Sequence, residues 1–238
     1  MQVVAARVSK AYGFLWALQD VSVTLAGGEF VILVGPNGAG KTTLLKVLAL
    51  LLEPTSGEVQ WNGRKNHRGS SEFRSAIGFF SPSEHLYDNL TAKENLCFFT
   101  ALYGKKKRPH DIEECLERVA LSARRDHRVS FLSAGMKSRL SIAKWMLLEP
   151  ELFLLDEPYA TLDQSGAHLL DSYLVQLVRN GGVVVMATHQ PSRAVALSTR
   201  AIALDSGKVV FDEPRQEPWK SLYQVCGEPS FQGSPWSS

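Results

Sequence analysis

Apolar and polar residues alternate over much of the first third of the chain. Residues 3–8 (VVAARV) and 21–25 (VSVTL) have the alternation of half-buried strands, and residues 29–35 (EFVILVG) form a denser apolar run that predicts a central strand. From Lys41 the stretch TTLLKVLALLL is long enough for a buried helix, and the proline, serine and glycine of EPTSG end it. A short strand, GEVQWNG, follows. The pattern therefore predicts strands, a loop, a helix and another strand.

The middle of the chain changes from polar to helical in character. Residues 64–75 are polar, which predicts a loop, and the apolar stretch AIGFF then predicts a strand. Residues 91–147 are predominantly helical, with apolar positions at helical spacing in LTAKENLCFFTALYG and RLSIAKWMLL. We therefore expect a helical insertion between two strands.

Apolar runs and helices alternate in the last third of the chain. Three apolar runs, LFLL, GGVVVMAT and RAIALD, are separated by the helical segment QSGAHLLDSYLVQLVRN and by a short one that begins near Pro191. Such runs, alternating with helices, predict a parallel sheet that is covered on both faces. From Asp212 onward the chain is rich in proline, glycine and serine, which predicts an irregular tail.

The composition is that of a globular chain. Its 238 residues are 45% hydrophobic, enough for one large α/β domain or two small ones. A formal net charge of +2 gives no basic surplus of the kind that nucleic-acid binders concentrate on one face, so we expect no nucleic-acid partner. Cys97, Cys115 and Cys226 are widely spaced, which favours reduced, structural thiols in a cytosolic protein. We find no signal-peptide pattern and no apolar run of about 18 residues, so we expect no membrane span.

The most informative motif is glycine-rich and lies between a predicted strand and a predicted helix. Residues 35–43, GPNGAGKTT, match the P-loop pattern G-x-x-x-x-G-K-[ST] in the context that it requires. Its glycines let backbone N–H groups turn toward an anion, and the N-terminus of the following helix adds partial positive charge. Lys41 supplies a charge for the β- and γ-phosphates, and the Thr42 hydroxyl can bind Mg²⁺. The expected nucleotide-binding residues are Gly35, Pro36, Asn37, Gly38, Ala39, Gly40, Lys41, Thr42 and Thr43.

Two adjacent acids follow the apolar strand LFLL. Burying charge is costly unless it is compensated, so Asp156 and Glu157 require partners. We expect Asp156 to face Mg²⁺ together with Thr42, and Glu157 to polarise the attacking water as a general base. The P-loop and the acid pair together predict a site that binds and hydrolyses a nucleotide.

Further motifs occur in an order that is typical of one family. After GPNGAGKTT come FLSAGMKSRL, similar to an L-S-G-G-Q signature, then LFLLDEP, the segment ATLD and the strand VVVMATH. With these motifs the chain resembles the nucleotide-binding subunit of ATP-binding cassette (ABC) proteins over residues 1–212, with a helical insertion at about 84–147 and an irregular tail at 213–238. The resemblance implies an α/β fold with a P-loop NTPase core on a RecA-like parallel sheet, an antiparallel β subdomain and an inserted helical subdomain.

The resemblance also assigns roles outside the P-loop. Ser133 and Gly135 precede a helix, and in the family this signature binds the γ-phosphate of an ATP held by a second subunit. The resemblance therefore implies two such domains, head to tail around two ATP molecules, in a homodimer or a heterodimer. His189 is placed like the switch histidine that contacts the γ-phosphate. Asp163 is placed like the aspartate that couples the two sites, while capping of the helix from Gln164 is an equally good alternative.

An aromatic side chain close to the N-terminus is expected to stack on the adenine. Tyr12, in VSKAYG, is placed like the residue that has this role in the family. Phe14 and Trp16 are alternatives from the same stretch. A purely structural role, packing in the core, stays open.

The sequence departs from the family pattern at two places. The family has a glutamine after the strand AIGFF that touches Mg²⁺, the attacking water and the membrane partner, but here that position falls on Pro82 or Ser83, neither of which has a carboxamide. Glu84 or His85 could substitute for it. In the signature an alanine replaces a glycine and Met136 replaces the terminal glutamine. We therefore expect retained ATP binding, with hydrolysis that is slow or depends on a partner.

The resemblance implies an ATP-hydrolysing motor subunit of an ABC membrane transporter. Such a subunit lies on the cytoplasmic face of the membrane and contacts an integral membrane subunit through a groove between its core and its helical insertion. The stretch LYDNLTAKENLCFFTALYG and the short signature LSAGM are most similar to exporter-type motors, including those of haem export and cytochrome c maturation. Two alternatives stay open: a soluble ABC ATPase that acts as an assembly or scaffold factor, and a regulatory cassette with weak hydrolysis.

Overall fold

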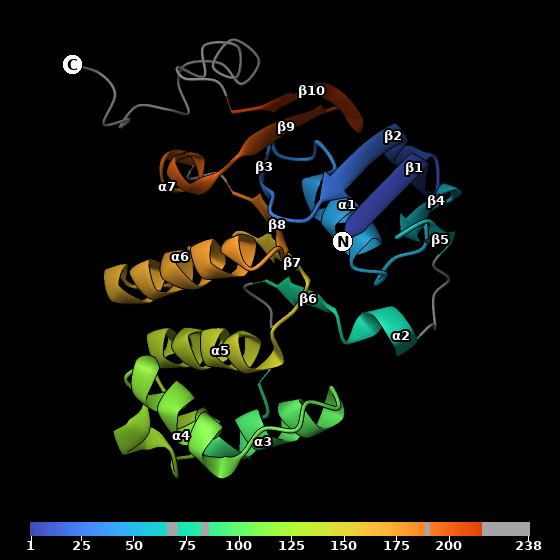
Figure 1. The fold of residues 1–238 in the computed structure, drawn as a ribbon. Helices are drawn as coiled ribbons and strands as arrows, with labels where there is room; N and C mark the ends of the chain where they lie inside the picture. Colours follow the sequence, from blue (N-terminus) through green and yellow to red (C-terminus); the bar gives the residue numbers. More distant parts are fainter. Residues whose placement is uncertain (66–70, 82–85, 189–190, 216–238) are drawn as a thin grey trace, which may run out of the picture.

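The N-terminal strands form an antiparallel sheet. The structure, a computed structural model, describes residues 1–65, 71–81, 86–188 and 191–215 (Figure 1). The strands of this sheet lie in the order β2–β1–β4–β5, with the bounds Gln2–Tyr12 for β1, Leu15–Ala26 for β2, Ser56–Trp61 for β4 and Arg64–Lys65 for β5. Three of the four are the strands that the alternating pattern predicts, and the antiparallel β subdomain is confirmed.

The prediction of a loop over residues 64–75 is wrong at its start. Asn62 and Gly63 have positive φ angles of 46° and 76°, and they form a two-residue turn in which Arg64 pairs with Trp61. Both central residues of such a turn need positive φ, which Asn-Gly adopts at little cost. The Asn-Gly pair was therefore the signal for this hairpin, and the polar character of the surrounding residues obscured it.

A short helix, α2 (Ser71–Arg74), also lies within this predicted loop. Its Phe73 packs against the buried Trp61, with ring centroids 5.5 Å apart. This contact fixes α2 to the antiparallel sheet. One apolar residue in a polar stretch creates no periodicity, so the pattern could not predict the helix.

The second sheet has six strands in the order β10–β9–β3–β8–β7–β6. Its strands are β3 (Phe30–Val34), β6 (Ile77–Phe80), β7 (Leu152–Asp156), β8 (Val183–Ala187), β9 (Arg200–Asp205) and β10 (Lys208–Pro214). All neighbouring strands are parallel except β9 and β10, so the predicted parallel sheet is confirmed.

Strand β10 is an addition to the predicted elements. Ser206 and Gly207 have φ angles of 48° and 79° and turn the chain back, so that Lys208 pairs with Asp205. The strand continues to Pro214, past residue 212, where the tail is expected to begin. Residues 216–238 of that tail lie outside the described residues.

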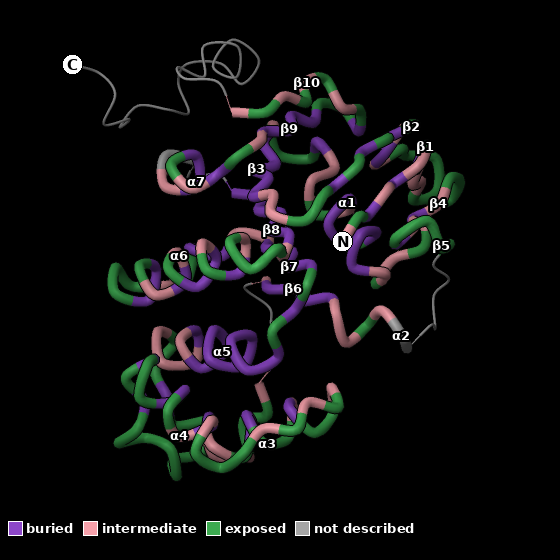
Figure 2. The backbone as a smooth tube through the Cα atoms, viewed as in Figure 1, coloured by how far each residue is buried: buried purple, intermediate pink, exposed green. Residues whose placement is uncertain are grey.

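The parallel strands are buried on both faces, as their continuous apolar sequences predict (Figure 2). In β3, Phe30 and Ile32 point into a core shared with helices α5 (Ala134–Leu148) and α6 (Gln164–Arg179). Val31 and Leu33 point into a core shared with helix α1 (Lys41–Leu48) and the antiparallel sheet. This alternation is the two-residue period of a strand with both faces covered. The parallel sheet is therefore the middle layer, and loops lie at the ends of its strands.

Helices pack on both faces of the parallel sheet, α1 on one face and α5 and α6 on the other. Their bounds are Lys41–Leu48 for α1, Ala92–Leu102 for α3, Pro109–Arg118 for α4, Ala134–Leu148 for α5, Gln164–Arg179 for α6 and Pro191–Leu197 for α7, with 3₁₀ turns at Ser122–Arg124 and Val129–Phe131. Figure 1 shows α5 beside α6, with α3 and α4 on the far side of α5. Helices α3, α4 and α5 confirm the helical character of residues 91–147.

The start of α3 shows how the sequence fixes a boundary in this region. The Thr91 hydroxyl accepts a hydrogen bond from the Glu94 N–H at 3.1 Å, and the Glu94 carboxylate accepts one from the Thr91 N–H at 2.8 Å. This reciprocal pair is a capping box, which satisfies two N–H groups that the helix cannot use.

The first helix is shorter than its apolar run predicts. It ends at Leu48, and Leu50 takes a positive φ of 57°. The N–H groups of Leu51 and Leu52 both donate to the Lys46 carbonyl, at 3.0 and 3.1 Å, which closes the last turn. Leu50 and Leu52 then pack against the core while Leu51 stays exposed, so an apolar sequence continues through a turn.

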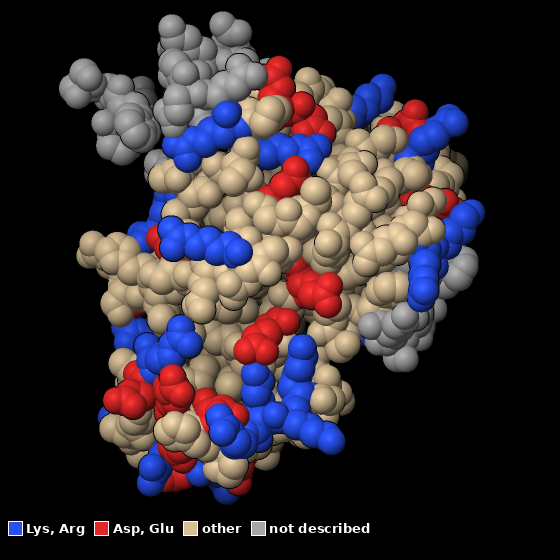
Figure 3. Space-filling model, in the orientation of Figure 1, with Lys and Arg blue, Asp and Glu red and all other residues tan. Residues whose placement is uncertain are grey.

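Charged side chains of both signs are mixed over the helical region on the face shown in Figure 3. Several of them are paired, such as Lys93 with Glu113 at 2.7 Å and Lys137 with Asp88 at 2.8 Å. None of the helices in the described ranges combines the length and the apolar character that crossing a bilayer requires.

Candidate active site

A glycine-rich loop joins β3 to α1 at the carboxyl edge of the parallel sheet. Gly35 and Gly40 have φ angles of +142° and +102°, which disfavour any residue with a Cβ. A Cβ would also lie 2.1 Å from the Leu204 carbonyl oxygen at Gly35, and 2.4 Å from the Ala17 carbonyl oxygen at Gly40. The loop is therefore held tightly between β2 and β9, and only glycine fits at these two positions.

The loop and the helix after it are suited to bind an anion. Residues 36–38 are exposed at the tip of the loop. The Lys41 ammonium group lies over the loop, where it donates to the carbonyl oxygens of Gly35 at 2.7 Å and Pro36 at 3.0 Å. Helix α1 starts at Lys41, and its N-cap, Gly40, has no side chain to occupy the first N–H groups. These donors and the helix N-terminus together form a phosphate-binding arrangement.

The structure brings Thr42 and Asp156 together across 114 positions of sequence. The Thr42 hydroxyl donates to Asp156 Oδ1 at 3.1 Å. Burial raises the pKa of the Asp156 carboxyl, the hydrogen bond from Thr42 opposes this, and the neighbouring charge of Glu157 raises the pKa further. A bound cation would stabilise the ionised form of this half-buried carboxyl, because the attraction between the two charges offsets the cost of desolvating the carboxylate. The Thr42 hydroxyl and the Asp156 carboxylate are both oxygen ligands of the kind that Mg²⁺ prefers, so the residues fit the predicted metal.

The described residues contain no cluster of three or more His, Cys, Asp and Glu side chains arranged to hold a metal ion. Magnesium in a nucleotide site commonly takes one or two protein oxygens and completes its shell with phosphate oxygens and water. Thr42 and Asp156 therefore suffice as the protein's share of such a site.

Glu157 lies at the start of a tight turn directly after β7. Its φ is +50°, its N–H donates to the Ala187 carbonyl oxygen at 2.9 Å, and its carbonyl oxygen accepts from the Ala160 N–H at 3.2 Å. Main-chain bonds thus fix the position of this acid between the ends of β7 and β8. An uncommon backbone conformation that the surroundings enforce is frequent at functional sites.

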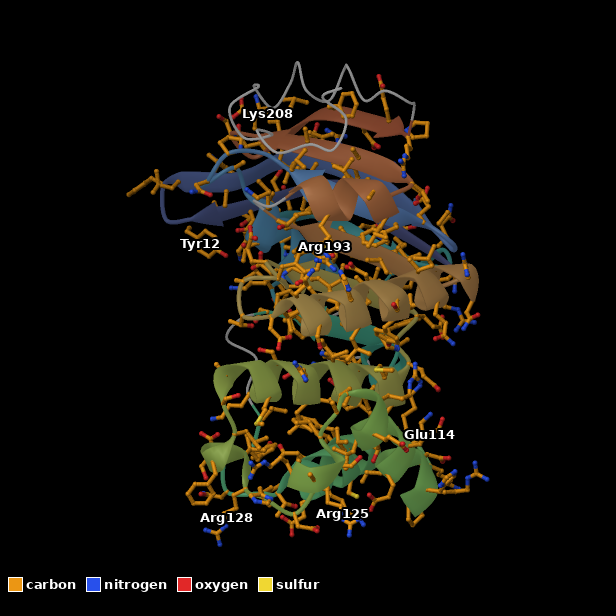
Figure 4. All side chains as sticks on the ribbon, turned by 90° about the vertical axis from the view of Figure 1, so that its left-hand side faces the viewer. Tyr12, Glu114, Arg125, Arg128, Arg193 and Lys208 are labelled. Carbon is orange, nitrogen blue, oxygen red and sulfur yellow. The ribbon has the colours of Figure 1, made fainter. Side chains whose placement is uncertain are left out.

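The N-terminal aromatic residues are exposed at the hairpin between β1 and β2. Tyr12 is 52% exposed, with the Lys10 ammonium 5.6 Å from the centre of its ring, and it projects from the edge of the hairpin in Figure 4. Phe14 is fully exposed and Trp16 is about half exposed. The alternative of core packing is therefore wrong for all three, and each remains able to stack on a base.

Ser133 precedes α5, as the sequence predicts, whereas Gly135 lies within its first turn, because the helix already begins at Ala134. Ser133 is the N-cap, and its hydroxyl accepts from the Met136 N–H at 3.3 Å. A Cβ on Gly135 would meet nothing within 4 Å, so this face of the first turn is open. Within the described part of the chain neither residue hydrogen-bonds to the glycine-rich loop.

Asp163 caps α6, which confirms the structural alternative for this residue. Its Oδ1 accepts from the Gly166 N–H at 2.7 Å, and its Oδ2 accepts from Arg139 on α5. These two contacts lower the pKa of the Asp163 carboxyl, the first more than the second. Ser138, next to Arg139, donates to the Thr161 hydroxyl at 2.9 Å. The helix after the signature is thus joined to the ATLD segment, a link that the separate motifs did not predict.

Two groups of predicted residues lie outside the described ranges. His189 is one of them, and residues 82–85, where the missing glutamine and its substitutes would fall, are the other. Their predicted roles are untested.

The parallel sheet covered on both faces, the glycine-rich loop before α1 and the Thr42–Asp156 contact define a P-loop NTPase domain. Residues 18–160 match the ABC transporter family, and the chain belongs to this family as an ATP-binding subunit.

Proteins of known family are similar in sequence to most of this chain. The ABC transporter ATP-binding protein NatA of Bacillus subtilis (strain 168) is 34% identical over 200 residues, which cover 82% of this chain and 80% of the relative. The cytochrome c biogenesis ATP-binding export protein CcmA of Escherichia coli (strain K12) is 36% identical over 187 residues, which cover 77% of this chain and 87% of the relative.

Solved structures show the same fold. An ATP-binding cassette that is dimeric, in a post-hydrolysis state with ADP and Pi bound, superposes with a TM-score of 0.79 at 29% identity and covers 90% of this chain and 99% of its own. An ATP-binding subunit of an ABC transporter has a TM-score of 0.85 at 27% identity, with 95% of each chain covered. These similarities confirm the predicted family and fold class.

Proposed function

We propose that this chain is the ATP-hydrolysing motor subunit of a membrane exporter. It works as a head-to-tail dimer around two ATP molecules with Mg²⁺, on the cytoplasmic face of the membrane and bound to an integral membrane subunit. The 3.1 Å contact between Thr42 and Asp156 is the observation that best supports ATP hydrolysis, because it brings the end of β7, with its two acidic residues, next to the phosphate-binding loop.

The residues of this site divide the chemistry between them. The N–H groups of the loop and the Lys41 ammonium bind the phosphates, and Thr42 and Asp156 hold Mg²⁺. When bound, Mg²⁺ supplies positive charge that neutralises the phosphate oxygens. Glu157, held by its main-chain bonds, accepts a proton from the attacking water.

The remaining residues complete the site in the proposed dimer. Tyr12 stacks on the adenine, and His189 contacts the γ-phosphate. Ser133 and Gly135 of the second chain present the open N-terminus of α5 to the same phosphate. The dimeric cassette with ADP and Pi, which shares this fold, supports the dimer.

A groove between the core and the helical region supports the membrane partner. It has a volume of about 400 Å³ and lies between the end of α1, strand β6, the end of α3 and helix α5. Its apolar lining includes Leu51, Phe79, Tyr103 and Trp145. The Lys144 ammonium lies 4.5 Å from the centre of the Phe99 ring, and Phe99 contacts the exposed Phe98, so the lining is continuous with the aromatic side chains of α3. Two basic side chains, Arg74 and Lys144, also line the groove. A groove with apolar walls and basic side chains accepts a short amphipathic helix, here a cytoplasmic helix of the membrane subunit.

The function of one relative, CcmA, favours export. CcmA is described as an export protein of cytochrome c biogenesis, and it matches 77% of this chain. We infer the same direction of transport here, and haem or a related group is the first cargo to test.

Affinity purification tests the motor function. The tagged full-length chain is purified from detergent-solubilised membranes with ATP present, and an integral membrane protein should co-purify in stoichiometric amount. Leu51→Glu should abolish this recovery, because Leu51 is 56% exposed in the groove. Val210→Glu on β10 is the matched control, since Val210 is 51% exposed outside the groove. Recovery of a soluble partner alone, or of none, would favour a scaffold factor instead.

A further inference from the structure

Three side chains from separate elements meet beside the turn that carries Glu157. Tyr159 lies on this turn, Asp171 on α6 and Arg193 on α7. The Tyr159 hydroxyl donates to Asp171 Oδ1 at 2.7 Å, and Arg193 Nε donates to Asp171 Oδ2 at 2.6 Å. The guanidinium carbon of Arg193, labelled in Figure 4, lies 5.6 Å from the centre of the Tyr159 ring. Each of the three side chains therefore contacts the other two.

These contacts are largely shielded from solvent. Tyr159 is 8% exposed, and the side chains of Asp171 and Arg193 are 17% and 31% exposed. Burial raises the pKa of the Tyr159 phenol, and the neighbouring Asp171 adds to this, so the phenol stays protonated and keeps donating. Partly buried charge-assisted bonds are stronger than neutral surface ones. We call these three residues the tyrosine–aspartate–arginine network.

The network secures one end of a turn whose other end is fixed by main-chain bonds. At the first end, the Glu157 N–H donates to the Ala187 carbonyl oxygen of β8 at 2.9 Å. At the second end, the Tyr159 hydroxyl reaches Asp171, which also binds Arg193. Strand β8 thus contacts the first end of the turn through Ala187, and helix α7 contacts the second end through Arg193. The network therefore restrains the end of the turn that the main-chain bonds of Glu157 do not reach.

We propose that Tyr159, Asp171 and Arg193 are positioning residues that hold the Glu157 turn in the orientation required for ATP hydrolysis. This inference rests on the role proposed above for Glu157. Displacement of a catalytic group by about 1 Å can slow a reaction by about 10²-fold, so a network of this kind affects the rate strongly. The three residues act through Glu157 and not on the nucleotide, so ATP binding is independent of them.

Two substitutions in the full-length chain test the network. Tyr159→Phe removes only the hydroxyl, and Arg193→Gln removes the charge. Each should slow single-turnover hydrolysis of Mg²⁺-ATP by about 5- to 30-fold, while the Kd for ATP changes by less than about 2-fold. Arg193→Lys, which keeps the charge and one donor, should recover part of the rate. The double variant Tyr159→Phe/Arg193→Gln should be no slower than the slower single variant, because both break one unit.

Arg200→Gln is the matched control for a loss of stability alone. Arg200 binds Asp212 at 2.6 Å, and these side chains are 18% and 27% exposed, which resembles the network pair. Arg200 starts β9, at the edge of the sheet opposite the glycine-rich loop. The variant Arg200→Gln should lower the melting temperature as Arg193→Gln does, but its rate of ATP hydrolysis should be unchanged at temperatures where the chain is folded.

The outcomes separate this inference from the proposed function. Unchanged hydrolysis in Tyr159→Phe and Arg193→Gln, or a loss no larger than in Arg200→Gln, overturns the network. Glu157→Gln is measured in the same assay. If Glu157→Gln is slow while the network variants are normal, only this inference fails. If Glu157→Gln hydrolyses ATP at the normal rate, the proposed general base fails and the network cannot act through it.

Discussion

The substitution Glu157→Gln removes one carboxylate and leaves its surroundings intact. The two side chains are similar in size, and the bonds that shape the turn come from the main chain: the N–H to Ala187 at 2.9 Å and the carbonyl oxygen to Ala160 at 3.2 Å. The φ of +50° costs glutamine about as much as glutamate, because both have a Cβ. Asp156 keeps its hydrogen bond from Thr42. We therefore expect the variant to fold and to bind ATP normally.

The expected effect on hydrolysis follows from the loss of the base. A positioned general base contributes about 10²- to 10⁴-fold, and each tenfold change corresponds to about 1.4 kcal/mol, so the barrier should rise by about 3–6 kcal/mol. The amide of glutamine can still hydrogen-bond a water molecule, but it cannot accept the proton at neutral pH. The ATP-bound dimer should then accumulate, because its breakdown requires hydrolysis.

Three measurements check this prediction. Single-turnover hydrolysis of radiolabelled ATP with Mg²⁺ gives the rate, equilibrium binding gives the Kd for ATP, and size-exclusion chromatography with ATP gives the dimer. Glu151→Gln is the control, because Glu151 is exposed and directly precedes the other end of the same strand, β7. Normal hydrolysis in Glu157→Gln would remove this residue from the role of base. Weakened ATP binding would show that its side chain contributes to the binding site itself.

Three further predictions concern the parts that hold the site. Burial raises the pKa of Asp156 above its unfolded value, so the stability that this carboxyl contributes is lost as pH rises through the folded pKa. In thermal denaturation without nucleotide, Asp156→Asn should therefore raise the melting temperature at pH 7 and have little effect below about pH 4. The same variant should lose the stabilisation by Mg²⁺-ATP. Gly35→Ala should destabilise the chain far more than Gly38→Ala, which should cost about 1–2 kcal/mol in urea denaturation, because both have positive φ but only Gly35 is crowded. Arg200→Gln should cost at least about 2–3 kcal/mol of unfolding free energy in the same assay, since it breaks two bonds to Asp212, at 2.6 and 2.7 Å, and one to the Thr24 carbonyl oxygen at 2.7 Å.

The sequence was most informative where one local pattern decides the structure. The continuous apolar runs predict strands buried on both faces, as β3, β7 and β8 are. The glycine-rich loop was predicted together with its strand and its helix, because the motif requires both neighbours. The contact between Thr42 and Asp156 followed from shared chemistry, since both residue types bind the same metal.

The remaining features depend on contacts that no local pattern specifies. The α2 helix is fixed by Phe73 on Trp61, and the tyrosine–aspartate–arginine network joins three elements whose sequences contain no common motif. The strands β5 and β10 follow Asn-Gly and Ser-Gly turns, and such residue pairs favour a hairpin. The polar residues beside these turns favour a loop instead, so the two sequence signals disagree. Sequence patterns predict which elements form, whereas packing decides which side chains meet.

The order of the strands connects the proposed docking groove to the acid pair. Phe79, on β6, lines the groove and pairs in register with Leu154 on β7. Two residues further along β7 is Asp156, followed by Glu157. Neighbouring strands in a packed sheet move together, because their main-chain hydrogen bonds and buried side chains resist relative displacement. A partner helix that displaced β6 would therefore act on the strand that ends in Asp156 and leads directly into Glu157. This short route supports the proposed coupling between partner binding and ATP hydrolysis.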